Sequence, residues 1–330
     1  KKVVDDKVTL NVRLQGAGGD ALAVNRAYAA VKFPWDVTMK VGRFPLDWED
    51  AFYATDFAGY MMNDAFVTDF DPFSTAAHFY KPFGMGSFEL FFAHEEDFFD
   101  YDYDGNGVAD LSDSYIWGAR LGFDFNEQFH MAVNYVRHDM FYSDLDVGTI
   151  WGDLIFNFTP GFAFKGQYFM QDLDDWWAYF DDSPSAWKAV LDVDQDVLGG
   201  FTSLWLEYAQ IDQNFLFMNA DPYAWAASAS GFGVFKEFFD FPVSYAAADT
   251  TILNIVAKQQ WNDQWWTYVR YIDFDSDVDE IDYTGWTASV RYNYTPNLWF
   301  EVGYDKIDND VVDYFGLNDN MVWFRTTVNF

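Results

Sequence analysis

The chain has 330 residues, of which 51% are hydrophobic and 22% aromatic, and its formal net charge is −34. This apolar composition excludes a disordered acidic protein, and the negative charge excludes nucleic-acid binding, which needs a basic surface. The chain has no cysteine, which excludes disulfides and thiolate metal sites, and no apolar run approaches the ~20 residues of a membrane helix. The start "KKVVDDKVTL" lacks the pattern of a signal peptide, so we expect a mature or a trimmed chain.

Apolar and polar residues alternate from the first predicted strand to the last, which is typical of half-buried β-strands. In "KVTLNVRLQG", for example, Leu10 and Val12 lie on one face, and Asn11 and Arg13 lie on the other. The predicted strands cover 7–15, 25–33, 36–43, 74–81, 86–94, 114–125, 128–138, 148–158, 162–171, 196–210, 212–218, 250–260, 264–273, 282–294, 298–306 and 321–330.

Two kinds of connection alternate between these strands. Tight turns of turn-forming residues are predicted at 33–36, 126–128, 159–161, 262–264 and 295–297. Long acidic loops are predicted at 44–73, 95–113, 172–195, 219–249, 274–281 and 307–320. We therefore expect a single domain over residues 1–330 with about sixteen strands, in a range of about fourteen to eighteen, and with both termini on the rim of short turns.

The distribution of residues between the two faces distinguishes a membrane barrel from a soluble sandwich or propeller. Nine of the 19 basic residues fall on the polar face: Arg13, Arg26, Lys32, Lys40, Arg120, Lys165, Lys258, Arg291 and Arg325. The opposite face is apolar and carries aromatic residues at the strand ends, among them Phe123, Phe125, Phe129, Phe156, Phe158, Phe162, Phe164, Tyr292 and Tyr294. Strands that are apolar outside and polar inside, with aromatic girdles, predict an all-β transmembrane antiparallel β-barrel. A soluble sandwich or propeller would not explain the regular alternation of turns and loops.

The last strand, "MVWFRTTVNF", ends in the aromatic Phe330, and "NRAYAAVKFPWDVTMKVGRFPLDWED" is similar to an early porin hairpin. On these features the chain resembles the general porins of the Gram-negative outer membrane. The resemblance implies short periplasmic turns and long extracellular loops. It also implies a homotrimer in outer-membrane lipid and lipopolysaccharide, and Phe330 as the signal read by the barrel-assembly machinery. The implied function is passive diffusion of ions and small hydrophilic solutes, not catalysis.

Charge is unevenly divided in the predicted channel. The nine basic residues form an inward ladder, whereas most acids crowd the loops. The porin resemblance implies that the third long loop, here 95–113, folds into the barrel. Its carboxylates would then face the basic residues of the barrel wall. The acidic mouth favours cations at low salt and the basic wall opposes them, so we predict a weak preference for cations.

The stretch "DYDGNGVADLSD" has the spacing of a calcium-binding loop. Its predicted ligands are the side chains of Asp102, Asp104 and Asn106, the carbonyl of Val108, and Asp110 and Asp113. A strand follows where a calcium-binding helix pair would place a helix. We therefore predict a structural Ca²⁺ site in a barrel loop, with a merely acidic turn as the alternative.

Two other functions stay open. A structural barrel could anchor a surface layer or the cell wall, with a wall-binding domain removed from the start of this chain. A substrate-specific carbohydrate channel would use the aromatic stretches 174–182 and 223–241 to stack sugar rings. No nucleophile elbow, phosphate loop or HExxH motif is present.

Overall fold

The computed structural model describes residues 2–4, 6–15, 23–52, 66–67, 75–101, 110–140, 145–173, 183–217, 244–246, 248–277, 282–308 and 320–328. Among these residues no helix is both long and apolar enough to cross a membrane.

The described residues are almost entirely in strands, sixteen of which have six or more residues. The strands are β1 (Lys2–Val3), β2 (Val8–Gln15), β3 (Ala23–Lys32), β4 (Thr38–Arg43), β5 (Thr75–Phe83), β6 (Gly86–Tyr101), β7 (Asp110–Asp124), β8 (Phe129–Met140), β9 (Leu145–Thr159), β10 (Phe162–Leu173), β11 (Ser185–Val193), β12 (Ser203–Ile211), β13 (Leu216–Phe217), β14 (Ser244–Tyr245), β15 (Thr250–Gln260), β16 (Trp265–Ser276), β17 (Tyr283–Thr295), β18 (Leu298–Asp308) and β19 (Asn320–Val328). Two single-turn 3₁₀ helices, η1 (Pro34–Asp36) and η2 (Asp50–Phe52), complete the elements. Of the described strands, seventeen belong to one sheet, and β13 and β14 form a separate two-stranded sheet.

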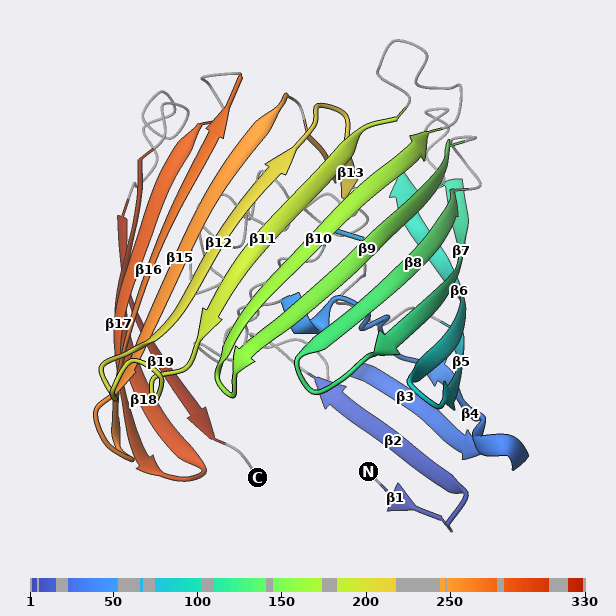
Figure 1. Ribbon diagram of the computed structural model, residues 1–330, viewed down its shortest axis with the longest axis horizontal. Helices are drawn as coiled ribbons and strands as arrows, with labels where there is room; N and C mark the ends of the chain where they lie inside the picture. Colours follow the sequence, from blue (N-terminus) through green and yellow to red (C-terminus); the bar gives the residue numbers. More distant parts are fainter. Residues whose placement is uncertain are drawn as a thin grey trace. The chain divides into compact units, whose positions relative to one another are not determined.

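The chain divides into two units. The first comprises Lys1–Trp48, Val67–Asp153 and Phe169–Ser183, and the second comprises Glu49–Phe66, Leu154–Tyr168 and Pro184–Phe330. In the first unit, strands β2 to β8 pair antiparallel in chain order. In the second, β11, β12 and β15 to β19 do the same (Figure 1). Each unit is therefore a meander, as the alternation of tight turns and longer loops predicts.

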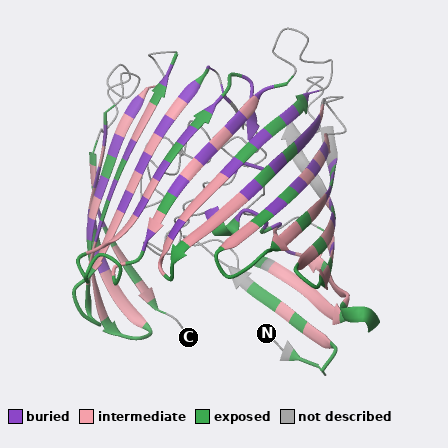
Figure 2. Cartoon of the chain, in the orientation of Figure 1, coloured by how far each residue is buried: buried purple, intermediate pink, exposed green. Residues whose placement is uncertain are grey.

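Each strand buries one face and exposes the other. Along β7, for example, Ile116 is 7% exposed and the adjacent Trp117 is 40% exposed. The exposed face is apolar, with residues such as Val133 and Val302, and the buried face carries polar residues such as Asn134 and Glu301. Figure 2 shows this alternation along the strands of both units. The sheet thus inverts the distribution of a soluble protein, as the sequence predicted.

One predicted strand is wrong and one was missed. Residues 185–193 were assigned to the acidic loop 172–195 but form β11, because Ala186, Lys188 and Val190 alternate with outward residues. The predicted strand 212–218 contributes only the two residues of β13. The predicted strand 196–210 begins later, at Ser203, because Gly199 and Gly200 have φ of 67° and 82° in the preceding turn.

Asparagine shapes two of the short turns. The side-chain oxygen of Asn126 accepts hydrogen bonds from the backbone N–H groups of Gln128 and Phe129, at 2.8 and 3.0 Å. Asn262 does the same for Gln264 and Trp265. Such side-chain bonds mimic a backbone turn. Aromatic pairs gather at these strand ends, including Phe125–Phe129 at 5.4 Å and Trp265–Tyr292 at 4.7 Å between ring centroids. The predicted aromatic girdle at the short-turn ends is present.

The predicted loop 95–113 is mostly strand. Strand β6 continues to Tyr101, and β7 starts at Asp110, its backbone partner across the hairpin. The expected boundaries were wrong because the acidic residues on both sides of the tip hid the extended pattern. Whether the loop enters a lumen stays a prediction.

Candidate functional site

The polar face carries both basic and acidic residues. Of the nine predicted basic residues, Lys40, Arg120, Lys165 and Arg291 form ion pairs with carboxylates. These carboxylates belong to Asp47, Glu89, Asp153, Asp192 and Glu301. The expectation that the acids lie in the loops was therefore wrong for Glu89, Asp153, Asp192 and Glu301, which belong to strands, whereas Asp47 lies in the predicted loop 44–73. A strand acid that pairs with a base lies on the same face as the base, so the period-2 alternation is the signal that identifies these acids.

The other predicted basic residues lie in different settings. Arg13 and Arg26 are backbone partners in β2 and β3, and Lys32 is exposed at the end of β3. The guanidinium of Arg325 lies 5.7 Å from the Trp323 ring centroid. The ninth residue, Lys258, belongs to the pocket described below.

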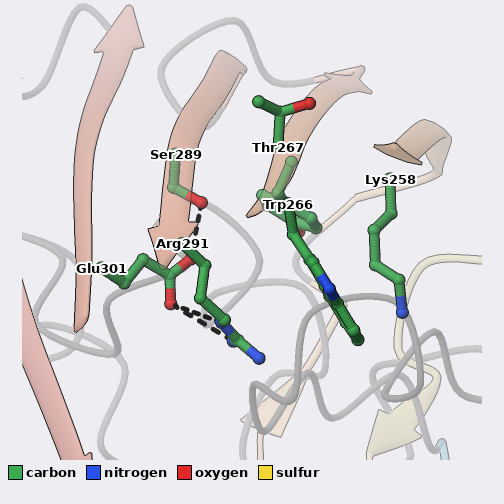
Figure 3. A pocket seen from close by; sticks show the side chains of 7 residues that line it. Lys258, Trp266, Thr267, Ser289, Arg291 and Glu301 are labelled. Carbon is green, nitrogen blue, oxygen red and sulfur yellow. Dashed lines mark hydrogen bonds and ion pairs between the residues drawn. The ribbon is translucent and has the colours of Figure 1, made fainter. Parts of the chain in front are cut away.

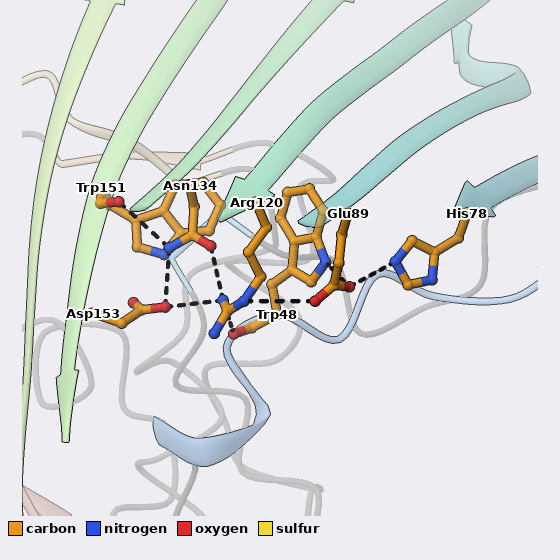
Figure 4. A network of polar contacts seen from close by, with 7 residues as sticks. All are labelled: Trp48, His78, Glu89, Arg120, Asn134, Trp151 and Asp153. Carbon is orange, nitrogen blue, oxygen red and sulfur yellow. Dashed lines mark hydrogen bonds and ion pairs between the residues drawn. The ribbon is translucent and has the colours of Figure 1, made fainter. Parts of the chain in front are cut away.

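Arg120 is the centre of a polar network in the first unit (Figure 4). Its Nη1 donates to the side-chain oxygen of Asn134 at 2.8 Å and to Asp153 Oδ2 at 2.9 Å. Asn134 itself donates to the same Asp153 oxygen at 2.9 Å. Strand register explains the arrangement, because Glu89 and Asn134 are the backbone partners of Arg120 in β6 and β8. Asp153 is 4% exposed, so its negative charge is buried and compensated within the network.

The same network holds the segment that follows β4. Arg120 Nη1 donates to the backbone carbonyl of Trp48 at 3.0 Å, and the Trp48 indole donates to Glu89 Oε2 at 3.1 Å. The same Glu89 oxygen lies 2.7 Å from His78 Nε2. Trp48 lies over Gly118, where a Cβ would be 3.1 Å from its ring carbon Cζ3. The glycine therefore gives the indole room to lie against the polar face.

The continuation of this segment lies on the polar face of the second unit. Phe52 is 1% and Phe66 0% exposed, and the Lys188 ammonium lies 5.9 and 4.9 Å from their ring centroids. Lys165 donates to the backbone carbonyl of Ala51 at 2.8 Å. Phe66 also packs edge-on against Phe215 at 5.8 Å. Cations and aromatic rings thus hold the described part of the first long loop against the strands.

A pocket opens on the polar face of β15–β18 (Figure 3). Trp266 lies between two cations, with Lys258 Nζ at 4.4 Å and the Arg291 guanidinium at 5.6 Å from its ring centroid. Arg291 also stacks on Trp299 at 4.0 Å and donates to Glu301 Oε2 at 3.2 Å. The wall of the pocket therefore combines charge with flat aromatic surface.

Aromatic residues are packed deeper on the same face. Trp205, Tyr268 and Trp323 form a buried cluster with Val190 and Val256. Trp323 lies flat on Gly303, where a Cβ would overlap the indole ring. The sugar-stacking candidates predicted from the sequence, 174–182 and 223–241, lie outside the described residues, and this cluster was not predicted. The alternation in β12, β16 and β19 is the signal that identifies it.

The calcium prediction falls largely outside the described residues. Asp102, Asp104, Asn106 and Val108 lie there, as does Phe330. Asp110 and Asp113 belong to β7, where the backbone of Asp110 pairs with Tyr101. Among the residues that are described, no three His, Asp or Glu side chains are grouped closely enough to hold a metal ion.

No protein-family model and no curated protein matches the chain, but solved structures do. OccK8 (OprE) of Pseudomonas aeruginosa superposes with a TM-score of 0.54 at 10% identity, over 92% of this chain and 78% of that one. OprD of the same organism gives 0.50 at 14% identity, over 94% and 80%. Wzi of Escherichia coli, an outer-membrane protein involved in group 1 capsule assembly and described as a carbohydrate-binding β-barrel, gives 0.52 at 12% identity, over 92% and 73%.

These likenesses, at such low identity, concern the fold. The chain has the fold of a transmembrane antiparallel β-barrel of the bacterial outer membrane. In such a barrel the apolar face of the sheet contacts lipid and the polar face lines the interior. The networks described above therefore lie on the interior face.

Proposed function

We propose that this protein is an outer-membrane porin, a water-filled channel for passive diffusion of ions and small hydrophilic solutes, and not an enzyme. The observation that supports it best is the polar, charged face of the sheet opposite a continuous apolar face. Sixteen-stranded barrels enclose an aqueous lumen rather than a side-chain core. Charged side chains on the lumen wall are the usual determinants of ion selectivity.

The segment after β4 narrows the channel in this proposal. Trp48 and Phe52 are buried against interior-facing strands, at 5% and 1% exposure. The resemblance to general porins assigned this task to the third long loop. That assignment stays a prediction, and the contacts of the described residues support the same role for the first long loop.

We propose a weak preference for cations. Among the described residues, Lys40, Arg120, Lys165 and Arg291 are ion-paired, which reduces the positive potential of the wall. The net charge of −34 makes the channel mouth negative. Because the mouth is solvated, the preference should fade as salt shortens the Debye length.

Single-channel recording in a planar bilayer under a salt gradient tests this function. We expect stepwise increases in current as single channels open, and a reversal potential whose sign shows a preference for cations. The reversal potential should approach zero at molar salt. Steps in groups of three would support the homotrimer that the porin resemblance implies. An inserted barrel that never conducts would refute the channel and favour a structural anchor.

A carbohydrate-specific channel is the second candidate, favoured by Trp266, whose ring lines the pocket on the polar face of β15–β18. Aromatic faces suit the apolar faces of sugar rings. In the same recordings a linear oligosaccharide would block the current saturably in a specific channel. A current that falls in proportion to the oligosaccharide concentration, without saturation, would favour the general porin.

We also propose that the loop tip binds a structural Ca²⁺ through Asp102, Asp104, Asn106, Val108, Asp110 and Asp113, the set that its spacing supports. The ion would neutralise clustered carboxylates. Asp102→Ala with Asp104→Ala should lower the unfolding temperature in millimolar Ca²⁺ and leave it unchanged in chelator. An equal loss in both conditions would contradict the site.

The remaining partners are proposals from the porin resemblance: surrounding lipid and lipopolysaccharide, and a barrel-assembly machinery that recognises the terminal Phe330. Deleting Phe330 should slow membrane insertion in cells and leave refolding in detergent intact. Unchanged insertion would exclude that role for the residue.

A further inference from the structure

One arginine on the polar face differs from the others. Arg270 of β16 is 1% exposed, and its Nε donates to the side-chain oxygen of Asn254 in β15 at 3.1 Å. Asn254 is 0% exposed. Both residues belong to the second unit, where their strands are paired.

This pair has three buried nitrogens with unused hydrogen-bond capacity. Neither Nη1 nor Nη2 of Arg270 has a hydrogen-bond partner, and neither has Asn254 Nδ2. The orientation of the amide is fixed, because the opposite orientation would place two donors against each other. The site therefore presents hydrogen-bond donors only, in a place where a guanidinium cannot lose its charge.

No carboxylate among the described residues compensates this guanidinium. Glu207 and Asp305 lie on the same face, as the partners of Asn254 and of Thr287 respectively. Glu207 accepts a hydrogen bond from the Trp205 indole at 2.8 Å, and neither acid forms an ion pair with Arg270. By contrast, Arg120 contacts the carboxylate of Asp153 at 2.9 Å, and Arg291 contacts that of Glu301 at 3.2 Å.

We propose that Arg270 and Asn254 bind an oxyanion group — a carboxylate, phosphate or sulfonate — carried by a solute in the channel. A planar guanidinium presents parallel N–H groups that match two oxygens of such a group, and the Asn254 amide adds a donor beside them. This inference rests on the proposed channel and names a class of solute that the channel holds on its way through.

Thermal unfolding of the folded barrel in detergent tests binding without requiring conductance. Sodium acetate, phosphate and methanesulfonate, each compared with sodium chloride at equal ionic strength, are the probes. We expect at least one oxyanion to raise the unfolding temperature saturably. Arg270→Gln should weaken the apparent affinity about tenfold or more, as expected when charge-assisted hydrogen bonds are lost.

Arg325→Gln is the matched control, because it removes one positive charge from the same face of the same unit. The Arg325→Gln variant should keep an oxyanion affinity within about twofold of that of the wild type. A change of that size is smaller than the change expected from the loss of a charge-assisted hydrogen bond. Equal weakening in both variants would show only a general electrostatic effect and would overturn the site. Equal stabilisation by chloride would also overturn the proposed site, because a single spherical ion does not use the paired N–H groups of the guanidinium. Stabilisation that does not saturate with oxyanion concentration would overturn it as well, because a specific site saturates.

Asn254→Asp gives an independent test that does not remove the arginine. The new carboxylate would pair with Arg270 and supply the missing acceptor internally. We expect a higher unfolding temperature in chloride and loss of stabilisation by oxyanions. Retained oxyanion stabilisation in this variant would overturn the proposal.

The two proposals fail separately. A barrel that is stabilised by oxyanions but never conducts would refute the channel and keep the site. A conducting barrel without saturable stabilisation would keep the channel and refute the site.

Discussion

Arg120 and Arg270 both lie on the polar face of a strand, each in a different unit, but their surroundings differ. The Arg120 side chain contacts a backbone carbonyl, an amide and two carboxylates. Arg270 is more deeply buried and has one hydrogen bond, from Nε to an amide oxygen. The first arginine completes a network, whereas the second leaves both Nη atoms buried without an acceptor.

The difference shows how one residue type serves structure in one place and recognition in another. A compensated buried charge fixes geometry, because removing any partner leaves another charge uncompensated. An uncompensated buried charge costs stability in the empty protein, and a ligand that supplies the acceptor recovers it. The network around Arg120 therefore suits the task of holding the Trp48 segment, and Arg270 suits a binding site.

The same substitution at the two positions gives the largest test of this comparison. Arg120→Met leaves the buried Asp153 without its cation, and we expect a loss of about 3–5 kcal/mol in the free energy of unfolding. Arg270→Met removes an uncompensated charge, and we expect a gain or no loss in chloride. Urea unfolding of both variants measures the two values.

Losses of similar size would contradict the comparison, since Arg270 would then be as well compensated as Arg120. The double variant Arg120→Met with Asp153→Asn is the control. It should recover part of the loss, because the amide removes the uncompensated negative charge.

The sequence predicted the sheet better than it predicted these networks. Period-2 alternation identified the faces of β7 and β17 correctly, because lipid on one side and water on the other constrain every second residue. It also placed Arg120 and Arg291 on the polar face. Which base meets which acid depends on register between strands, and register is set by turn lengths that alternation does not contain.

Two errors have the same physical origin. Strand β11 was taken for a loop because the acids that precede it outweighed its short alternating run. The buried segment at Trp48 and Phe52 was taken for an ordinary acidic loop, because the contacts that hold it come from Glu89, Arg120 and Lys188 far along the chain. Local pattern identifies an element, but not a segment whose conformation depends on distant partners.

Trp48 gives the smaller and more specific test. Trp48→Phe keeps an aromatic ring at this position and removes the indole N–H that donates to Glu89, together with one ring of the indole. We expect a loss of about 1.5–3 kcal/mol in the free energy of unfolding, the usual contribution of a hydrogen bond to a charged group. The single-channel conductance should change little, since the ring keeps its place.

Trp48→Ala removes both the hydrogen bond and the ring, so the segment loses its contacts with Phe91 and Trp151. The conductance should then rise clearly above that of Trp48→Phe, because the channel loses part of its constriction. If both variants conduct like wild type, the segment does not narrow the channel and the Arg120 network has only a structural role. If Trp48→Ala alone conducts more, the compensated network around Arg120 holds the constriction in place.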